Sequence, residues 1–158
     1  MAGSRRELIG LGHDLQLVSE VAAAAALSAP EVFFTAAELR HFAASAVPPQ
    51  SLAGGFAAKE ALFKALPPTA RPWFWTDAEL VHDGRGAPGF RLRGALADEL
   101  AHRRPQVSVS LSHSGGFVSA VVLVTGTAGR ANRFRNTIDR AVRHVLRRNT
   151  ADPAGAPQ

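Results

Sequence analysis

The chain has 158 residues, which is the size of one ordinary domain. Its composition is 46% hydrophobic and 20% charged, as expected of a globular protein that buries one core. Cysteine is absent, which excludes disulfides, thiolate catalysis and cysteine-ligated zinc.

The formal net charge of +5 is concentrated near the end of the chain. Residues 130–150 hold seven arginines and one aspartate, so the rest of the chain is close to neutral. We therefore do not expect the body to bind nucleic acid. No apolar run reaches the ~18 residues of a membrane span, and charged residues interrupt any signal-peptide core near the N-terminus. We expect a cytoplasmic protein.

The first predicted element is a strand over Leu8–Val18. Because side chains alternate along a strand, Gly10, Gly12 and Asp14 share one face. A glycine in a strand often marks the close approach of a ligand or of another backbone. We expect the missing side chains to leave room beside the Asp14 carboxylate.

Helical segments come next. A helix and a loop around Pro30 are predicted over residues 19–34, followed by helices over Thr35–Ala46 and Ser51–Leu66. Thr35 and Glu38 have the spacing of a capping box. Proline pairs should end both of the later helices.

The second half of the chain is richer in strands. Strands over Glu79–His82 and Gly89–Arg93 flank a turn-forming segment, and a short helix over Ala95–Arg104 follows. Two more strands are predicted over Val107–Ser112 and Phe117–Thr125, the latter apolar enough to be central. This order predicts an α+β fold with an antiparallel sheet and packed helices.

The chain divides near residue 126. We expect a domain over residues 1–126, a basic amphipathic helix over 127–150 and a disordered tail over 151–158. The basic helix is a candidate docking surface for an acidic partner. The alternatives are that it packs on the body or on a neighbouring subunit, or that it binds a membrane surface.

Glu60 is the first candidate functional residue. It lies between Phe56 and Phe63, on a helical face that should point to the core. A carboxylate there is costly unless it is paired, protonated or bound to a cation. Lys64 stands four residues later, so the alternative is a simple Glu60–Lys64 ion pair.

Asp14 and His113 are the other candidates. Asp14 and Glu60 together would form a hard oxygen site that suits magnesium held jointly with phosphates, and a nearby lysine would neutralise a phosphate leaving group. Alone, Asp14 would be a turn or capping residue. His113 follows a strand and precedes a Gly-Gly turn, a common position for binding residues, or else it is an exposed turn histidine.

Four blocks of sequence resemble holo-acyl-carrier-protein synthase, the short, single-repeat class of 4′-phosphopantetheinyl transferases. They are the run GLGHDL from Gly10, the helix SLAGGFAAKEALFKAL from Ser51, the segment WTDAEL from Trp75 and the strand VSVSLSH from Val107. Their order and spacing agree with the family over about residues 8–125, and FAAKEALFKAL is the most specific block.

The resemblance implies a Mg²⁺-dependent transferase. Such enzymes move phosphopantetheine from coenzyme A to a serine of an acyl carrier protein, and are usually homotrimers with sites between subunits. By the same resemblance Asp14 and Glu60 are metal ligands, and Glu60, Lys64, His113 and Asp14 form the catalytic set. Lys59, Lys64, His113 and Ser114 are the expected coenzyme A contacts.

Several positions depart from the family pattern. Leu17 replaces a glutamate, Glu20 a basic carrier-docking residue and Gly55 an arginine, while Ser114 stands where aspartate or threonine is frequent. These changes leave two alternatives open. One is a repurposed relative in a biosynthetic pathway that catalyses a different acid–base step on an intermediate. The other is a non-catalytic binding protein.

Overall fold

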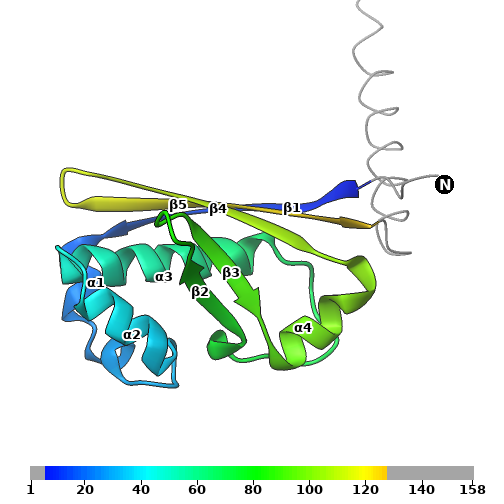
Figure 1. The fold of residues 1–158 in the computed structure, drawn as a ribbon, viewed down its shortest axis with the longest axis horizontal. Coiled ribbons are helices and arrows are strands. Elements are labelled where there is room, and N and C mark those ends of the chain that lie inside the picture. Colours follow the sequence, from blue (N-terminus) through cyan, green and yellow to red (C-terminus); the bar gives the residue numbers. More distant parts are fainter. Residues whose placement is uncertain (1–5, 128–158) are drawn as a thin grey trace, which may run out of the picture. The chain divides into compact units, whose positions relative to one another are not determined.

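The central element of the fold is a three-stranded antiparallel sheet. The computed structural model describes residues 6–127, and its strands β1 (Arg6–Leu17), β5 (Phe117–Thr127) and β4 (Gln106–Ser114) lie in the order β1-β5-β4. The prediction that the apolar final strand is central is thus confirmed. Figure 1 shows this sheet edge-on, with the helices of residues 6–127 on one side of it.

The remaining elements cover that side. They are α1 (Val18–Ala23), α2 (Ala36–Ala43), α3 (Pro48–Ala65), the hairpin of β2 (Ala78–His82) and β3 (Pro88–Leu92), and α4 (Gly94–Leu100). Short 3-10 turns occupy Ala25–Ser28, Trp75–Asp77 and Ala101–Arg103. The α+β class with antiparallel sheets is confirmed.

The proline pair before α3 begins that helix, whereas the sequence predicted that it ends the preceding one. Pro48 and Pro49 are the first residues of α3, and α2 already ends at Ala43. Proline is tolerated there because the first helical N–H groups have no partner within the helix. The capping box of Thr35 and Glu38 forms as predicted.

The glycines of β1 make room for a helix. A Cβ built at Gly10 would overlap the carbonyl oxygen of Ala65, and one at Gly12 would overlap that of Ala61. The expected space beside Asp14 on this face is therefore taken by the backbone of α3. The glycines allow the strand and the helix to pack closely, so here they mark the approach of another backbone and not of a ligand.

The predicted apolar face of α3 needs a correction as well. Phe63 is 55% exposed, whereas Leu62 is buried. Most buried positions of α3 are alanine or glycine, namely Ala53, Gly54, Gly55, Ala57, Ala58, Ala61 and Ala65. Small residues let the helix approach its neighbours closely, so its buried surface is wider than a stripe of large side chains would indicate.

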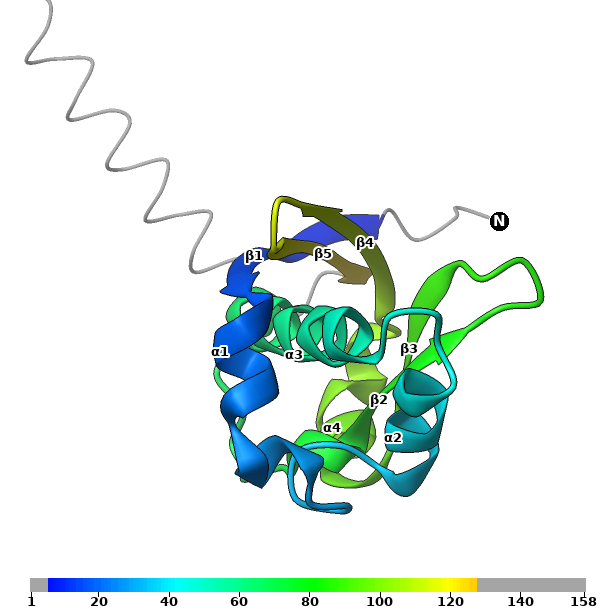
Figure 2. The same ribbon diagram turned by 90° about the vertical axis from the view of Figure 1, so that its left-hand side faces the viewer.

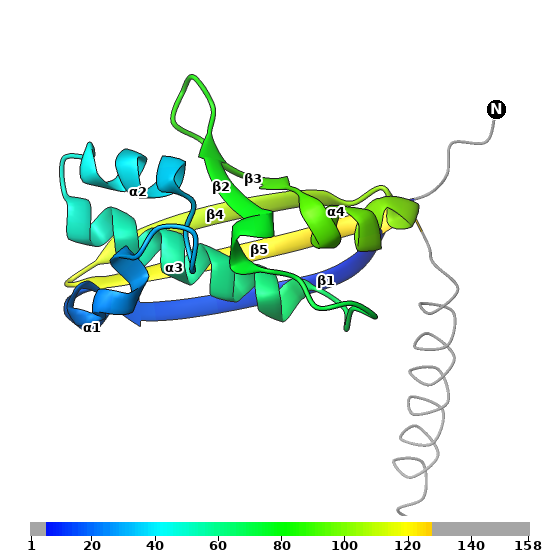
Figure 3. The same cartoon turned by 90° about the horizontal axis from the view of Figure 1, so that it is seen from below.

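Helix α3 crosses the sheet obliquely. Ala61 and Ala65 in its second half lie over β1, while Gly54 near its start lies beside Val118 of β5 and Leu111 of β4. Figures 2 and 3 show α1 along one flank of α3 and α2 along the other. The helix therefore separates the β1 edge of the sheet from the β4 edge.

The sheet face that points away from α3 exposes many large apolar side chains. We call it the open sheet face; its exposed apolar members are Leu8, Leu11, Leu15, Phe117, Val121 and Leu123. Leu11 pairs with Leu123 across β1 and β5, so these side chains form a continuous surface. Contiguous apolar patches of this kind mark interaction surfaces.

In residues 6–127, no helix has both the length and the apolar character that a membrane crossing requires. The predicted basic helix over 127–150 and the tail over 151–158 lie outside the described residues, except for Thr127, the last residue of β5.

The packing of α3 on β1 generates a test. We expect Gly12→Ala to lower the free energy of unfolding by at least about 2 kcal/mol, because the new methyl group meets backbone that cannot move aside. Gly54→Ala is the matched control, since a Cβ there meets its nearest atom at 3.7 Å and alanine favours helix. Denaturant unfolding measures both. A Gly12→Ala protein as stable as Gly54→Ala would contradict the packing.

Candidate functional site

A buried carboxylate lies near the end of β1. Asp14 is only 7% exposed, and both of its oxygens are engaged. The ammonium of Lys64 lies 2.6 Å from Oδ1 and 3.2 Å from the carbonyl oxygen of His13. The amide of Gln16 donates to Oδ2 at 2.6 Å. We call Asp14, Gln16, Glu60 and Lys64 the Asp14 cluster.

Glu60 belongs to this cluster through its electrostatics. Partial burial raises the pKa of the Glu60 carboxyl, the nearby charge of Asp14 raises it further, and Lys64 acts in the opposite direction. A like charge produces such an effect only at short range. The strand and the helix thus bring two carboxylates and one ammonium together, and Lys64 forms its ion pair with Asp14 instead of the simple pair with Glu60.

This arrangement can hold a divalent cation. Two carboxylates prefer hard cations such as Mg²⁺, which keeps waters and takes substrate phosphates as further ligands. Lys64 occupies the Oδ1 side of Asp14, so a cation bound there would displace that ammonium. In the described residues no three Asp, Glu or His side chains gather around one point, so phosphate and water would complete the coordination.

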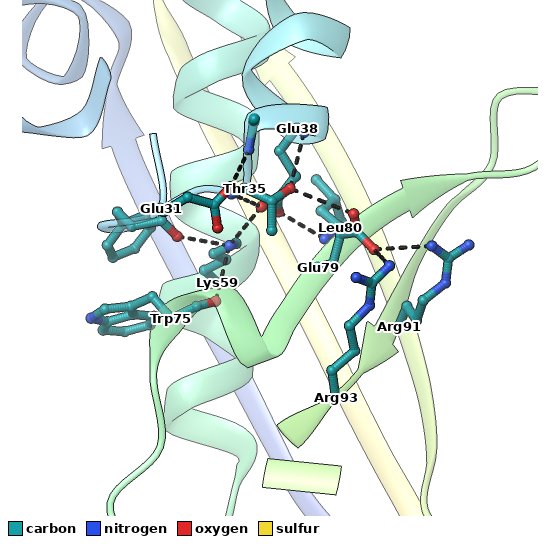
Figure 4. Close-up of polar contacts among 11 residues, drawn as sticks. Glu31, Thr35, Glu38, Lys59, Trp75, Glu79, Leu80, Arg91 and Arg93 are labelled. Atoms are coloured by element: carbon teal, nitrogen blue, oxygen red, sulfur yellow. Dashed lines mark hydrogen bonds and ion pairs between the residues drawn. The ribbon is translucent and has the colours of Figure 1, made fainter. Parts of the chain in front are cut away.

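Lys59, predicted to contact coenzyme A, lies in the core of the described domain. Its ammonium is fully buried and donates to the carbonyl oxygens of Phe33 and Trp75 and to the Glu38 carboxylate, at 2.8, 3.0 and 2.9 Å (Figure 4). Burial lowers the pKa of Lys59, and Glu38 offsets part of that effect. With three acceptors for three protons, this lysine fixes the position of α3.

Glu38 extends that network beyond its capping role. It accepts from the backbone N–H of Leu80 at 2.8 Å, which links α2 to β2. Beside it, the buried Glu79 pairs with Arg91 at 3.0 Å and with Arg93 at 2.6 Å (Figure 4). These buried charges are all paired, as burial requires.

His113 lies at the other edge of the sheet. It pairs in register with Val118 of β5, which in turn pairs with Gln16 of β1, so β5 separates His113 from the Asp14 cluster. Helix α3 also runs between them. Ser114 falls on the opposite face of β4 from His113, because side chains alternate along a strand. Within one chain, the structure does not bring these two residues to Asp14.

His113 lines a cavity of about 380 Å³. The cavity lies between α2, the first turns of α3, β2 and the end of β4, and we call it the His113 cavity. Two further histidines line it, His41 from α2 and His82 from β2, with ring centroids 4.3 Å apart and planes inclined by 19°.

Sequence reasoning did not single out Gln16, His41 or His82. Gln16 could have been found, because it lies two residues after Asp14 on the same face of the strand. The histidines could not, since their stacking depends on how α2 packs against β2.

Comparisons with known proteins identify the family of this chain. The sequence profile of the 4′-phosphopantetheinyl transferase superfamily matches residues 10–122. The holo-[acyl-carrier-protein] synthase of Salinispora arenicola is 36% identical over 119 residues, which is 73% of this chain and 97% of that protein. The synthase of Clavibacter michiganensis is 42% identical over 83 residues, covering 52% of this chain and 69% of that one.

Solved structures share the fold. The acyl carrier protein synthase of Mycobacterium tuberculosis superposes with a TM-score of 0.61 at 33% identity, over 75% of this chain and 97% of that one. A coenzyme A complex of the Chronobacterium ammoniagenes enzyme gives 0.63 at 28% identity, over 75% and 98%. The class that fold and sequence define is the 4′-phosphopantetheinyl transferase superfamily. Within it, the chain belongs to the holo-acyl-carrier-protein synthase family.

The raised pKa of Glu60 generates a test of the cluster. A carboxyl group with a raised folded-state pKa destabilises the fold while it is ionised, so its cost is full at neutral pH and is lost as pH falls through the folded pKa. We therefore expect Glu60→Gln to raise the melting temperature at pH 7.5 in EDTA. This gain should shrink toward pH 4.5. The exposed Asp98→Asn is the control, and equal melting of Glu60→Gln and wild type at pH 7.5 would contradict the clustering.

Proposed function

We propose that this protein transfers 4′-phosphopantetheine from coenzyme A to a serine of an acyl carrier protein, with Mg²⁺ as its cofactor. The observation that supports this most is the convergence of Asp14 from β1 with Glu60 and Lys64 from α3. The relatives named holo-[acyl-carrier-protein] synthase and the coenzyme A complex of one structural neighbour support the same chemistry.

The residues divide the chemical work as follows. Asp14 and Glu60 would hold the Mg²⁺ ion, which when bound neutralises charge on the diphosphate of coenzyme A. The serine oxygen attacks the phosphorus next to pantetheine, the bond to the second phosphate breaks, and adenosine 3′,5′-bisphosphate leaves. The serine proton passes to water or to a base in the site. Lys64 is half-exposed and can turn from Asp14 toward the leaving phosphate, whose negative charge it stabilises.

Gln16 acts on Asp14 from the other side. Its amide holds Oδ2 while Oδ1 faces Lys64, which fixes the plane of the carboxylate. Residues that orient a metal ligand typically change metal affinity by about 10–100-fold when they are removed.

The complete site is shared between two copies of the chain in this proposal. The Asp14 cluster and the His113 cavity lie on opposite flanks of α3, so a head-to-tail interface can join the cluster of one copy to the cavity of the next. The open sheet face gives the copies an apolar surface to bury, with Leu11 61% exposed and Leu15 56% exposed. A ring of three copies, the homotrimer that the resemblance implies, would contain such head-to-tail interfaces and would give the open sheet face a partner surface.

Mass spectrometry of an apo acyl carrier protein tests the transfer. Incubation with coenzyme A and Mg²⁺ should add the phosphopantetheine mass, and Asp14→Ala or His113→Ala should each prevent this while the variants stay folded. A wild-type protein that adds no mass to any apo carrier protein would exclude the transferase and leave the repurposed or binding relative.

The same two variants test the shared site. When Asp14→Ala and His113→Ala chains are co-expressed and assemble at random, about a quarter of the interfaces join an intact cluster to an intact cavity. Mixed oligomers should therefore recover about a quarter of the wild-type transfer rate. Mixtures as inactive as the separate variants would mean that the site lies within one chain.

A further inference from the structure

Two stacked histidines join α2 to β2. The ring centroids of His41 and His82 lie 4.3 Å apart and their planes are inclined by 19°, so the rings pack face against face. His41 is exposed on α2, while His82 is half-buried at the end of β2. Histidine is the side chain whose charge changes most readily between pH 5 and pH 8. A contact made by two such rings is therefore sensitive to pH in that range.

This pair connects the second half of α2 to β2. Near the start of the helix, the buried Glu38 already binds the backbone N–H of Leu80 and so fixes the first half. Phe42, beside His41, lies against Gly55 of α3 instead. Among the ring and polar contacts of the described residues, the one that links the second half of α2 to β2 is the imidazole pair.

The same two rings lie between two hollows of the surface. Both rings line the His113 cavity, and both also line a neighbouring groove of about 440 Å³. The groove includes Asp83, Gly86 and Arg91 of the β2–β3 hairpin, which do not line the His113 cavity. Separation of the rings would therefore join the two hollows, so a change of charge at this pair is also a change of shape.

Other titratable and charged groups face the pair from each neighbouring element. They are Glu38 of α2, Glu79 of β2, Asp83 of the hairpin turn, Arg91 of β3 and His113 of β4. Both glutamates are already paired with cations (Figure 4). Burial lowers the pKa of His82 and His41 lowers it further, while Asp83 only partly opposes them. Two protonated rings at this separation would therefore repel each other.

We propose that the His41–His82 contact is a pH-sensitive switch, which holds α2 against β2 at neutral pH and loosens it in mild acid, when both rings are protonated. At neutral pH the uncharged rings stack favourably. As the pH falls below 6.5, the ordinary pKa of histidine, the separated rings take up protons more readily than the stacked ones, so the contact loses stability. The switch is built within one chain and does not depend on the proposed transferase function.

Hydrogen–deuterium exchange of the full-length protein tests the switch. Between pH 7.5 and pH 5.0, we expect the exchange of α2, corrected for its intrinsic pH dependence, to rise by at least about tenfold in wild type. Repulsion between two unit charges at this separation near a protein surface corresponds to about that factor or more. His41→Gln and His82→Gln should each reduce the rise to less than about threefold, because one charge is then missing.

The readout is the ratio between the two pH values, so a variant whose α2 is looser at both values still tests the switch. His102→Gln is the matched control, since His102 is exposed and lies outside this contact, and it should behave like wild type. No rise in wild type, or equal rises in wild type, His41→Gln and His82→Gln, would overturn the proposal.

Titration of the rings by nuclear magnetic resonance gives the second test. We expect the pKa of His82 to lie below 6.5 in wild type and to rise in His41→Gln, because the neighbouring charge is gone. His41→Lys, which carries a permanent positive charge at the same exposed position, should keep the pKa of His82 low. A His82 pKa that is the same in wild type and in His41→Gln would refute the repulsion on which the switch depends.

Discussion

The contact of α3 with two glycines of β1 determines where the functional groups lie. Because Gly10 and Gly12 have no side chains, the helix backbone at Ala61 and Ala65 rests directly on the strand. Glu60 and Lys64 leave the helix beside these alanines, and Asp14 is the next residue on the same face of the strand. A larger residue at either glycine would lift the helix and separate the ammonium from the carboxylate.

Buried polar contacts fix the same helix from its other side. Lys59 is neighbour to Glu60, and its three bonds tie α3 to α2, to the loop before α2 and to the segment before β2. Removing one partner of a buried ion pair commonly costs about 3–5 kcal/mol, so this lysine resists any rotation of α3. In this structure its three bonds position the helix, and the coenzyme A contact that the family resemblance implies for it stays a prediction.

Sequence patterns predicted the elements well, and the site in part. Alternation predicted the strands and the Thr35–Glu38 box predicted α2. The residue pattern singled out Asp14, Glu60 and Lys64, and the family resemblance then gave them their expected roles. The patterns failed where tertiary packing determines burial. The apolar stripe through Phe56 and Phe63 predicted one buried face for α3, but its small residues let the helix be buried on more sides. They also could not separate His113 from Asp14, since strand order β1-β5-β4 is a tertiary property. Within one chain, the expected site residues therefore lie in two separate places.

Divalent-ion binding tests the central claim most directly, because it depends on Asp14, Glu60 and Lys64 meeting at one point. Electron paramagnetic resonance can follow Mn²⁺ without any substrate, with thermal unfolding as the check that each variant is folded. We expect Asp14→Asn to weaken binding by at least about tenfold, and Lys64→Met to strengthen it because the ammonium no longer occupies Oδ1. Unchanged Mn²⁺ affinity in Asp14→Asn would contradict the account.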